Sequence, residues 1–353
     1  MKPRESLGLQ KGYHSPQLDV RVRLNTNESP FPPPKEFYSN FESKLKTLNL
    51  NRYPDRQYRL VRESLARAYE SSPNRIFCGN GSNEVLLNLA LSYGGAGRKA
   101  VVFEPTYSLH SHIAKTVGMD VLTLGRNENF CVTESLVEEA EEYQPDIVYL
   151  CSPNNPTGNL ESSKSISRVL TMKDEPLVVL DEAYGDFAEQ HETAGLKDYE
   201  NLIRLRTFSK WFDLAGLRFG FCEGSEEVVA VMDEVTLPYH LDQIKQAAVL
   251  AALEAKELFD LQAQRVIDLR DELFNNLVEI GVTAHPSNAN FILMEFENND
   301  PKEIWEELIK ESILVRDTSN WPRLRPSLRV TVGDAKENEM FVTALEKILK
   351  ARD

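Results

Sequence analysis

Short apolar runs alternate with helix-like segments over most of this chain, and no other feature of the sequence constrains the fold as strongly. Strand-like runs are expected at residues 76–78, 100–103, 121–124, 147–151, 177–180, 202–205 and 219–222. Helical patterns lie between several of them, at residues 56–71, 84–93, 111–117 and 133–143. Strands that alternate with helices favour a mostly parallel sheet covered by helices on both faces. The sequence therefore predicts an α/β fold.

The chain divides into three expected parts. Residues 1–35 show little apolar periodicity and end in consecutive prolines, which predicts an extended N-terminal arm. Residues 36–240 contain the alternating segments and form the large α/β domain. Residues 241–353 are expected to form a smaller α+β domain, with a long helical region towards residue 280, strands at 291–296 and 328–332, and helices at 302–312 and 336–350. The break at Leu237-Pro238 is the expected boundary.

The bulk properties exclude several classes of protein. A formal net charge of −15 argues against nucleic acid or an anionic membrane as the main partner. The four cysteines are scattered and form no C-x-x-C pair, which is typical of reduced, mostly buried thiols in a cytosolic protein. The first residues contain no apolar signal region, and no run is long enough to span a bilayer. A cytoplasmic protein is expected.

Polar clusters follow five of the predicted strands directly. They lie at residues 79–83, 105–107, 152–158, 181–184 and 209–210. In open, mostly parallel sheets the ligand binds beyond the carboxyl ends of the strands. These clusters are therefore expected to meet at one site.

The segment TFSKWFDLAGLRFG, residues 207–220, carries the most specific chemistry. Lys210 follows an apolar run, with Ser209 directly before it and Arg218 eight residues after it. A lysine that burial or its neighbours keep deprotonated is a nucleophile and can hold an aldehyde cofactor as a Schiff base. A hydroxyl and a guanidinium nearby suit the phosphate of such a cofactor. The alternative is a buried turn in which the lysine is incidental.

Two further clusters can complete a site for a flat heterocyclic ring. Asp181 ends the apolar run LVVLD, and Tyr184 follows three residues later. A carboxylate at the end of a buried strand can keep a ring nitrogen protonated, and an ordinary helix N-cap is the alternative. The loop CSPNNPTG places Asn155 directly before a proline, which favours extended geometry. Its amide can donate to a phenolate oxygen, and a simple turn is the alternative.

An anion site is expected where GNGSNE, residues 79–84, joins a strand to a buried helix. Gly81 allows close approach of the backbone, and Ser82 and Asn83 lie where the N–H groups of a helix N-terminus are free. The segment matches neither a Walker loop nor G-x-G-x-x-G, and a capped helix start is the alternative. Tyr107 follows another strand and can stack on a heterocycle, with core packing as its alternative.

Two arginines lie on predicted strands of the smaller domain, Arg316 in ILVRD and Arg329 in SLRVTVG. An arginine on an apolar strand is costly unless it meets an anion. A carboxylate held in bidentate fashion explains Arg329, and a salt bridge on an edge strand is the alternative. The six histidines form no H-x-x-x-H pair, so no metal site is expected.

In their order along the chain, the segments GNGSNE, PTY, SPNNPTG, DEAY, SK and LRVTVG resemble the fold-type I pyridoxal-phosphate aminotransferases. The chain is most similar to the histidinol-phosphate aminotransferase group. The N-terminal LNTNESP and the tripeptide Arg52-Tyr53-Pro54 are also similar, so the resemblance covers nearly the whole chain. It implies a large α/β domain, a smaller C-terminal domain, and pyridoxal 5′-phosphate as the cofactor.

The resemblance implies a role for each matching residue. Lys210 would hold the cofactor as a Schiff base and then move a proton between the substrate's α-carbon and the cofactor's C4′ atom. Asp181 would pair with the ring nitrogen. The other implied contacts are Asn155 and Tyr184 at the ring oxygen O3′, Tyr107 stacked on the ring, and Gly81, Ser82, Asn83, Ser209 and Arg218 around the phosphate.

The resemblance also implies how substrates and a partner subunit bind. Arg329 would bind the α-carboxylate, Arg316 could help with a distal anion, and Asn25 of the N-terminal motif would contact the substrate. Tyr53 would reach the cofactor phosphate of the partner subunit. This implies a homodimer with two shared active sites.

The chain departs from the family pattern beside the lysine. Trp211 and Asp213 stand where the family more often has small residues, and Asn83 stands where aspartate is usual. These departures leave the substrate open and do not affect the cofactor chemistry.

The expected activity is transfer of an amino group between histidinol phosphate, or another amino compound, and 2-oxoglutarate. The alternatives are a decarboxylase acting on an amino-acid phosphate, an aromatic amino-acid aminotransferase and a non-catalytic cofactor-binding module. A dinucleotide-binding dehydrogenase is disfavoured because its glycine fingerprint is absent.

Overall fold

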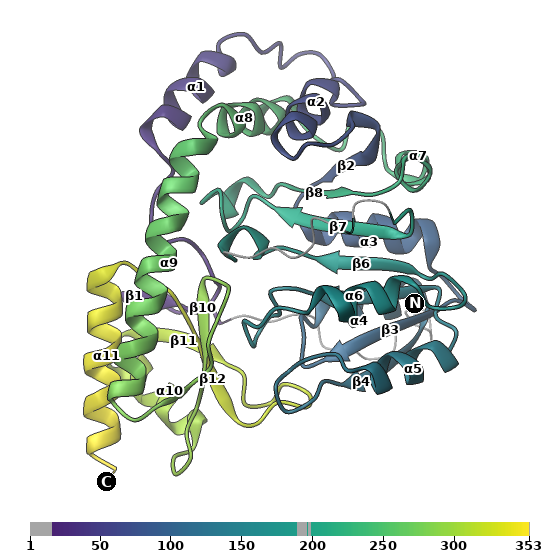
Figure 1. Cartoon of the computed structure of the whole chain (residues 1–353). Helices are drawn as coiled ribbons and strands as arrows, with labels where there is room; N and C mark the ends of the chain where they lie inside the picture. Colours follow the sequence, from purple (N-terminus) through teal and green to yellow (C-terminus); the bar gives the residue numbers. More distant parts are fainter. Residues whose placement is uncertain (1–15, 189–195, 197–198, 353) are drawn as a thin grey trace, which may run out of the picture.

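The computed structural model describes residues 16–188, 196 and 199–352, and its larger part is built around a seven-stranded sheet (Figure 1). The strand order is β2-β8-β7-β6-β5-β3-β4. The bounds are β2 (Ile76–Gly79), β3 (Lys99–Glu104), β4 (Asp120–Gly125), β5 (Ile147–Cys151), β6 (Leu177–Asp181), β7 (Leu202–Thr207) and β8 (Gly220–Glu223). Strands β4, β3, β5, β6 and β7 run parallel, and β8 is antiparallel to both neighbours. The predicted mostly parallel sheet is confirmed.

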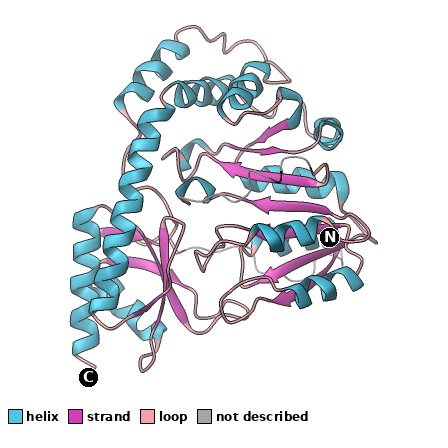
Figure 2. Ribbon diagram, in the orientation of Figure 1, coloured by secondary structure: helices cyan, strands magenta, loops and turns pink. Residues whose placement is uncertain are grey.

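Helices cover both faces of this sheet because its central strands are apolar on both sides (Figure 2). In β5, Ile147 and Tyr149 belong to one core, whereas Val148 and Leu150 belong to the other. The first core is closed by α3 (Ser82–Tyr93), α4 (Leu109–Val117) and α7 (Glu226–Val235). The second is closed by α5 (Glu134–Glu142) and α6 (Ser163–Leu170). Two-sided burial is the arrangement that parallel sheets require.

A third core lies beside β2 and β8, where α1 (Lys35–Leu45), α2 (Arg59–Ala68) and α8 (Gln243–Glu254) meet. It is rich in aromatic rings. Phe208 stacks on Phe212 with ring centroids 4.0 Å apart, and Phe219 contacts Phe208 edge-on at 4.9 Å. Because Phe208 and Phe212 lie on either side of Lys210 in the chain, their packing fixes the turn that carries the lysine.

A second, five-stranded sheet has the order β1-β11-β12-β10-β9. Its strands are β1 (Val22–Leu24), β9 (Thr283–Ala284), β10 (Phe291–Glu295), β11 (Ile313–Asp317) and β12 (Ser327–Thr331). Three helices share one core with it, namely α9 (Lys256–Glu279), α10 (Pro301–Lys310) and α11 (Ala335–Lys350). Strand β1 comes from the N-terminal segment and pairs with β11 in parallel. In Figure 1 the long helix α9 runs from the end of α8 down to this second sheet.

The structure differs from the sequence expectations in several elements. The expected N-terminal arm contributes strand β1, and its residues 1–15 lie outside the described part of the chain. Helices α1, α6 and α7 and strand β9 had no predicted counterpart. The long helical region beyond residue 242 consists of two helices, because the backbone leaves helical geometry at Ala255, with φ −101° and ψ 15°. Short or polar segments such as β1 and α6 carry too few apolar positions for a periodic signal.

Two bulk expectations can be compared with the structure. Cys78, Cys151 and Cys222 are buried free thiols, and Cys131 is partly buried. Among the described residues, no helix combines the length and the apolar character that a membrane crossing requires.

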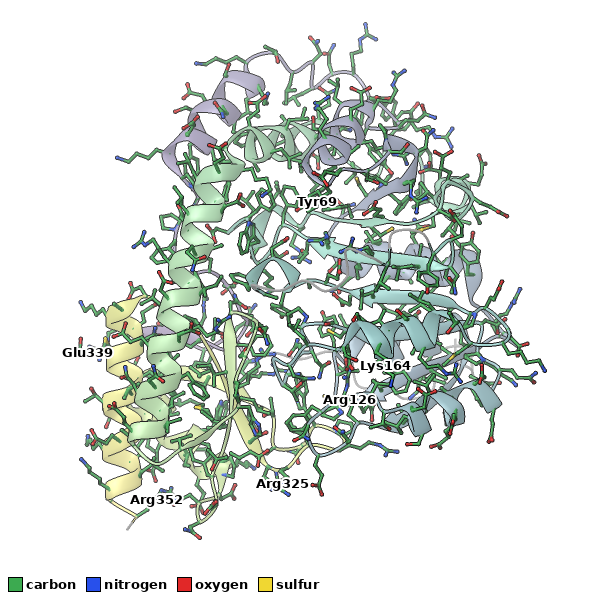
Figure 3. All side chains as sticks on the ribbon, in the orientation of Figure 1. Tyr69, Arg126, Lys164, Arg325, Glu339 and Arg352 are labelled. Atoms are coloured by element: carbon green, nitrogen blue, oxygen red, sulfur yellow. The ribbon has the colours of Figure 1, made fainter. Side chains whose placement is uncertain are left out.

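One buried ion pair fastens the loop after β5 to the large sheet. Arg126, labelled in Figure 3, bonds to the Glu161 carboxylate, and both side chains are at most 1% exposed. Arg126 also donates to the carbonyl oxygen atoms of Phe103 and Phe130 at 3.0 Å, and the Glu161 N–H donates to the Ser152 hydroxyl at 3.0 Å. The pair therefore holds both ends of the segment that contains Asn155.

Removing one partner of this pair should be strongly destabilising. We expect Glu161→Ala to lower the free energy of unfolding by about 3–5 kcal/mol, because it leaves a buried guanidinium without its counter-charge. Denaturant titration measures the change. The matched control is Glu346→Ala, which removes an exposed pair with Lys350 and should cost less than about 0.5 kcal/mol. Equal effects of the two substitutions would contradict this assignment.

Candidate active site

A cavity of about 370 Å³ lies beyond the carboxyl ends of the parallel strands. Ten of the predicted site residues line it: Ser82, Asn83, Tyr107, Asn155, Asp181, Tyr184, Ser209, Lys210, Arg218 and Arg329. They come from all five polar clusters that follow strands, from the strand-to-strand loop after Lys210, and from β12 of the second sheet. The cavity thus brings together segments that are far apart in the sequence.

Lys210 lies in the turn after β7, where the Leu214 N–H donates to the Phe208 carbonyl oxygen at 3.1 Å. Its amine Nζ donates to the carbonyl oxygen atoms of Thr26 and Asn27, at 2.9 and 2.8 Å. Burial, with the positive charge of Arg329, lowers the pKa of Lys210 to about 7. A large share of the amine is therefore neutral at neutral pH, as a nucleophile or a base requires.

The low pKa of Lys210 can be measured without cofactor or substrate. In the cofactor-free protein, we expect the acylation rate of Lys210 by acetic anhydride to reach half its maximum near pH 7, since only the neutral amine reacts. Mass spectrometry of the peptides gives the rate at each pH. Lys347 is the internal control, because its hydrogen bond from Nζ to Glu311 raises its pKa above the usual lysine value. A Lys210 profile that rises together with that of Lys347 would contradict the prediction.

Asp181 stands at the end of β6 and is only 3% exposed. One carboxylate oxygen accepts the Ala183 N–H at 3.0 Å, and the other lies 2.9 Å from Nε2 of His110. His110 is fully buried on α4 and stacks on Tyr149 at 5.4 Å. Its Nε2 is the donor in the tautomer that suits an ionised Asp181. Sequence reasoning did not single out this contact, because nothing near His110 in the chain marks its distant partner.

Asn27 is the site residue that sequence reasoning missed most clearly. Its amide nitrogen donates to the Tyr184 hydroxyl at 2.9 Å, and its amide oxygen accepts from Thr331 at 3.1 Å. Its carbonyl oxygen accepts from Lys210 at 2.8 Å and from Asn290 at 3.1 Å. The backbone at Asn27 has φ 54°, a left-handed conformation that asparagine adopts more readily than most residues. In the sequence, the motif LNTNESP was the one feature that pointed to Asn27 as a site residue.

Arg329 lies on β12 and is only 3% exposed. Strand β12 lies between β11 and β10, so the edge-strand interpretation of Arg329 is wrong. Its guanidinium donates to the side-chain oxygen of Asn155 and, at 3.0 Å, to the carbonyl oxygen of Asn25. It also lies 5.0 Å from the centre of the Phe291 ring. A buried cation aimed at neutral oxygen atoms is well suited to bind a carboxylate.

Another part of the cavity lining is suited to a phosphate. Helix α3 begins at Ser82, and Gly81 before it has φ 89°. A Cβ atom on Gly81 would lie 2.6 Å from Nη2 of Arg218, so only glycine lets the guanidinium approach the helix start. Arg218 donates to the Ser209 hydroxyl at 3.2 Å, and Tyr107 donates to the Asn83 side-chain oxygen at 3.2 Å. Helix N–H groups, a hydroxyl and a guanidinium are the donors that bind phosphate.

Four predicted site residues do not line the cavity. Gly81 lies directly behind Arg218, and the side chain of Asn25 donates to the Pro16 carbonyl oxygen at 3.0 Å. Arg316 stands opposite Arg329 in the register of β11 and β12, 5.8 Å from the Trp321 ring centre. Tyr53 is 80% exposed and stacks on Tyr239 at 4.5 Å. The roles of these residues stay predictions.

No group of metal-binding side chains occurs among the described residues. His14 and His191 lie outside them, so the expectation about histidines is tested only for the other four.

The residues present fit pyridoxal phosphate. The close approach of Arg218 to Gly81 forms a cradle at one end, and the Asp181 carboxylate lies among the residues lining the same cavity. Lys210 lines the cavity together with them, and its lowered pKa leaves a substantial share of its amine neutral at neutral pH. A flat ring with a phosphate arm, an aldehyde and a protonated ring nitrogen needs this set of groups.

The two-sheet fold and this site define a fold-type I pyridoxal-phosphate-dependent enzyme, as the sequence predicted. Residues 20–345 match the family model described as Aminotransferase class I and II, and the chain belongs to this family of transaminases. The predicted cofactor and enzyme class are therefore confirmed.

Comparison with individual proteins agrees with the family. The chain is 34% identical over 348 residues to the histidinol-phosphate aminotransferase of Caldanaerobacter subterraneus subsp. tengcongensis, with 98% of each chain covered. The structure of histidinol-phosphate aminotransferase from Sinorhizobium meliloti in complex with pyridoxal-5′-phosphate shares the fold, with TM-score 0.86, 23% identity and coverage of 95% of this chain and 92% of that one. L-threonine-O-3-phosphate decarboxylase from Porphyromonas gingivalis shares it as well, with TM-score 0.81, 23% identity and coverage of 93% and 99%.

Proposed function

We propose that this transaminase transfers an amino group between histidinol phosphate and 2-oxoglutarate. The observation that carries the proposal is the position of the buried Lys210 amine, with its lowered pKa, in one cavity with Asp181 and Arg329. The curated relative at 34% identity over almost the whole chain supports the choice of substrate.

Pyridoxal phosphate, when bound, supplies an aldehyde that bonds to amines and a protonated ring that withdraws electrons from the substrate's α-carbon. The protein's part is to hold this group. We assign its phosphate to the start of α3, Ser209 and Arg218, and its ring nitrogen to Asp181. The hydrogen bond between His110 and Asp181 supports this role, because it fixes the orientation of the carboxylate.

Lys210 is the base in this proposal. Its Nζ atom accepts the proton from the α-carbon of the substrate and later returns it at the C4′ carbon of the cofactor. Burial and Arg329 keep the amine available for this at neutral pH. A well-placed general base accelerates proton transfer by about 10²–10⁴-fold. The carbonyl oxygen atoms of Thr26 and Asn27 orient Nζ, since each accepts one of its protons.

Arg329 is assigned to the α-carboxylate of the amino-acid substrate, glutamate. The guanidinium is aimed at Asn155 and at the Asn25 carbonyl oxygen, so it can exchange a neutral acceptor for an anionic one. Arg316, directly opposite on β11, is assigned to a more distant anion such as the substrate phosphate.

Amino donors decide between the transaminase and the alternatives. We expect glutamate and histidinol phosphate each to convert the bound cofactor to its amine form, seen as loss of the absorption band near the visible edge. Phenylalanine, which lacks the phosphate, and O-phosphothreonine, which lacks the imidazole ring, should convert it at least about tenfold more slowly. A pocket that binds a polar group rejects ligands lacking that group. Lys210→Ala is the control and should show no conversion.

Two outcomes would contradict this proposal. Release of carbon dioxide from O-phosphothreonine, without conversion by glutamate, would identify a decarboxylase. Conversion by phenylalanine as fast as by histidinol phosphate would identify an aromatic aminotransferase.

We also propose a homodimer in which Tyr53 reaches the cofactor phosphate of the partner. Exposed apolar side chains near Tyr53 support this assembly: Leu50 is 67% exposed, Leu237 78% and Tyr239 42%. Gln243 holds the Tyr53 loop, donating to the carbonyl oxygen atoms of Asn49 at 3.1 Å and Arg52 at 2.7 Å.

The free thiols on the described chain support a cytoplasmic location for the protein.

Mixing two inactive variants tests the shared site. Tyr53→Ala and Lys210→Ala subunits, unfolded and refolded together, should recover about a quarter of the wild-type activity. Half of the dimers are mixed, and one of the two sites in each is intact. Each variant refolded alone is the control, and sedimentation gives the oligomeric state. A monomer, or a mixture no more active than its components, would contradict the proposal.

A further inference from the structure

The turn that carries Lys210 is tied to helix α9 by two side chains of the turn itself, Trp211 and Asp213. Trp211 donates from Nε1 to the Asp260 carboxylate at 2.7 Å. Gln262 donates from Nε2 to the Asp213 carboxylate at 2.8 Å. Both helix residues lie in the first two turns of α9, the long helix that reaches the second sheet (Figure 1).

The same stretch of α9 also holds the N-terminal arm. The Nε2 atom of Gln262 donates to the Pro32 carbonyl oxygen at 3.0 Å. One helical turn further, the Arg265 guanidinium lies 4.2 Å from the centre of the Phe31 ring. Gln262 thus bridges the arm and the lysine turn with one amide group.

Asp213 contacts the arm directly. Its carboxylate forms a hydrogen bond with the side chain of Ser29, whose hydroxyl also accepts the Phe31 N–H at 3.2 Å. Burial raises the pKa of Asp213 to about 7, and the hydrogen bonds from Ser29 and Gln262 oppose that rise. The backbone at Asp213 has φ 51°, in the left-handed region that favours glycine. Glycine would suit this backbone better than aspartate, so the contacts of the carboxylate are what aspartate adds at this position.

The arm segment beside these contacts covers the site. Thr26 and Asn27 lie three and two residues before Ser29, and their carbonyl oxygen atoms accept both hydrogen bonds from Lys210. Thr26, Asn27 and Glu28 line the cavity. A loose arm would therefore expose the lysine amine to water and open one wall of the cavity.

We propose that Asp213 is a positioning residue that, through Ser29 and Gln262, holds the N-terminal arm over Lys210. It contacts neither the cofactor nor the substrate, and acts by keeping Thr26 and Asn27 in place. Its effect on the reaction rests on the proposed function, whereas its effect on the arm does not.

Two substitutions of Asp213 separate the effect of the carboxylate from the effect of the backbone conformation. Asp213→Gly keeps the left-handed backbone and removes both hydrogen bonds, whereas Asp213→Asn keeps an acceptor oxygen and also tolerates positive φ. Gln262→Ala removes the bridge from the helix side. Gln264→Ala is the matched control, because the side chain of that exposed residue bonds to Asp268 on its own helix and to no other residue of the described chain.

Amide hydrogen exchange in the cofactor-free protein is the primary measurement. For residues 20–31 we expect about tenfold faster exchange in Asp213→Gly and Gln262→Ala, since two hydrogen bonds of modest net strength are lost in each. Asp213→Asn should stay within about threefold of the wild type, and Gln264→Ala should be unchanged. The pH at which Lys210 is half-maximally acylated should rise in Asp213→Gly, because water then reaches the amine.

Steady-state kinetics adds the functional readout. We expect Asp213→Gly to raise KM for the amino donor by about five- to tenfold and to change kcat less, since the arm forms a wall of the binding site. Asp213→Asn should restore the wild-type KM.

Unchanged exchange of residues 20–31 in both Asp213→Gly and Gln262→Ala would overturn the proposal. So would faster exchange that extends equally to β5 and β6, since that marks a general loss of stability. If Asp213→Gly does not fold, Gln262→Ala decides alone. If the wild-type protein binds no pyridoxal phosphate, the proposed function fails, while the exchange result still decides the role of Asp213 in the arm.

Discussion

The site depends on a lysine amine kept where its charged form is disfavoured. Burial is the main cause, and the positive charges of Arg329 and Arg218 add to it. The amine still needs hydrogen-bond acceptors, because a buried polar group without them is costly. Backbone carbonyl oxygen atoms of Thr26 and Asn27 meet this need without adding a negative charge that would restore the ammonium form. The N-terminal arm is therefore part of the chemistry as well as of the fold.

The arm in turn needs both sheets. Strand β1 pairs with β11 of the second sheet, and Asn27 bonds to Tyr184 beyond β6 and to Thr331 on β12. These contacts join segments more than 150 residues apart, and each buried polar atom of Asn27 has a partner. Because buried polar groups are nearly always hydrogen-bonded, such a network fixes one arrangement of the arm.

The large sheet and much of the site could be predicted because their signals are local. The run LVVLD reads as a buried strand, and the carboxyl-end rule then places Asp181, Asn155 and Lys210 together. Asn27 and His110 could not be predicted from their surroundings, since their partners lie 157 and 71 residues away. Strand β1, with three residues, is held by its pairing with β11 more than by any pattern of its own.

In the proposed mechanism, the division of the site between two sheets would couple substrate binding to the strength of the base. Lys210 and Asp181 belong to the large sheet, whereas Arg329 and the arm belong to the second. The charge of Arg329 is one cause of the low Lys210 pKa. If Arg329 binds the substrate carboxylate as proposed, that carboxylate would offset the charge of Arg329, and the pKa of Lys210 would rise. The lysine would then be a weaker base in the empty site and a stronger base once an anionic substrate is bound. The arginine proposed to bind the substrate would therefore also adjust the proposed base.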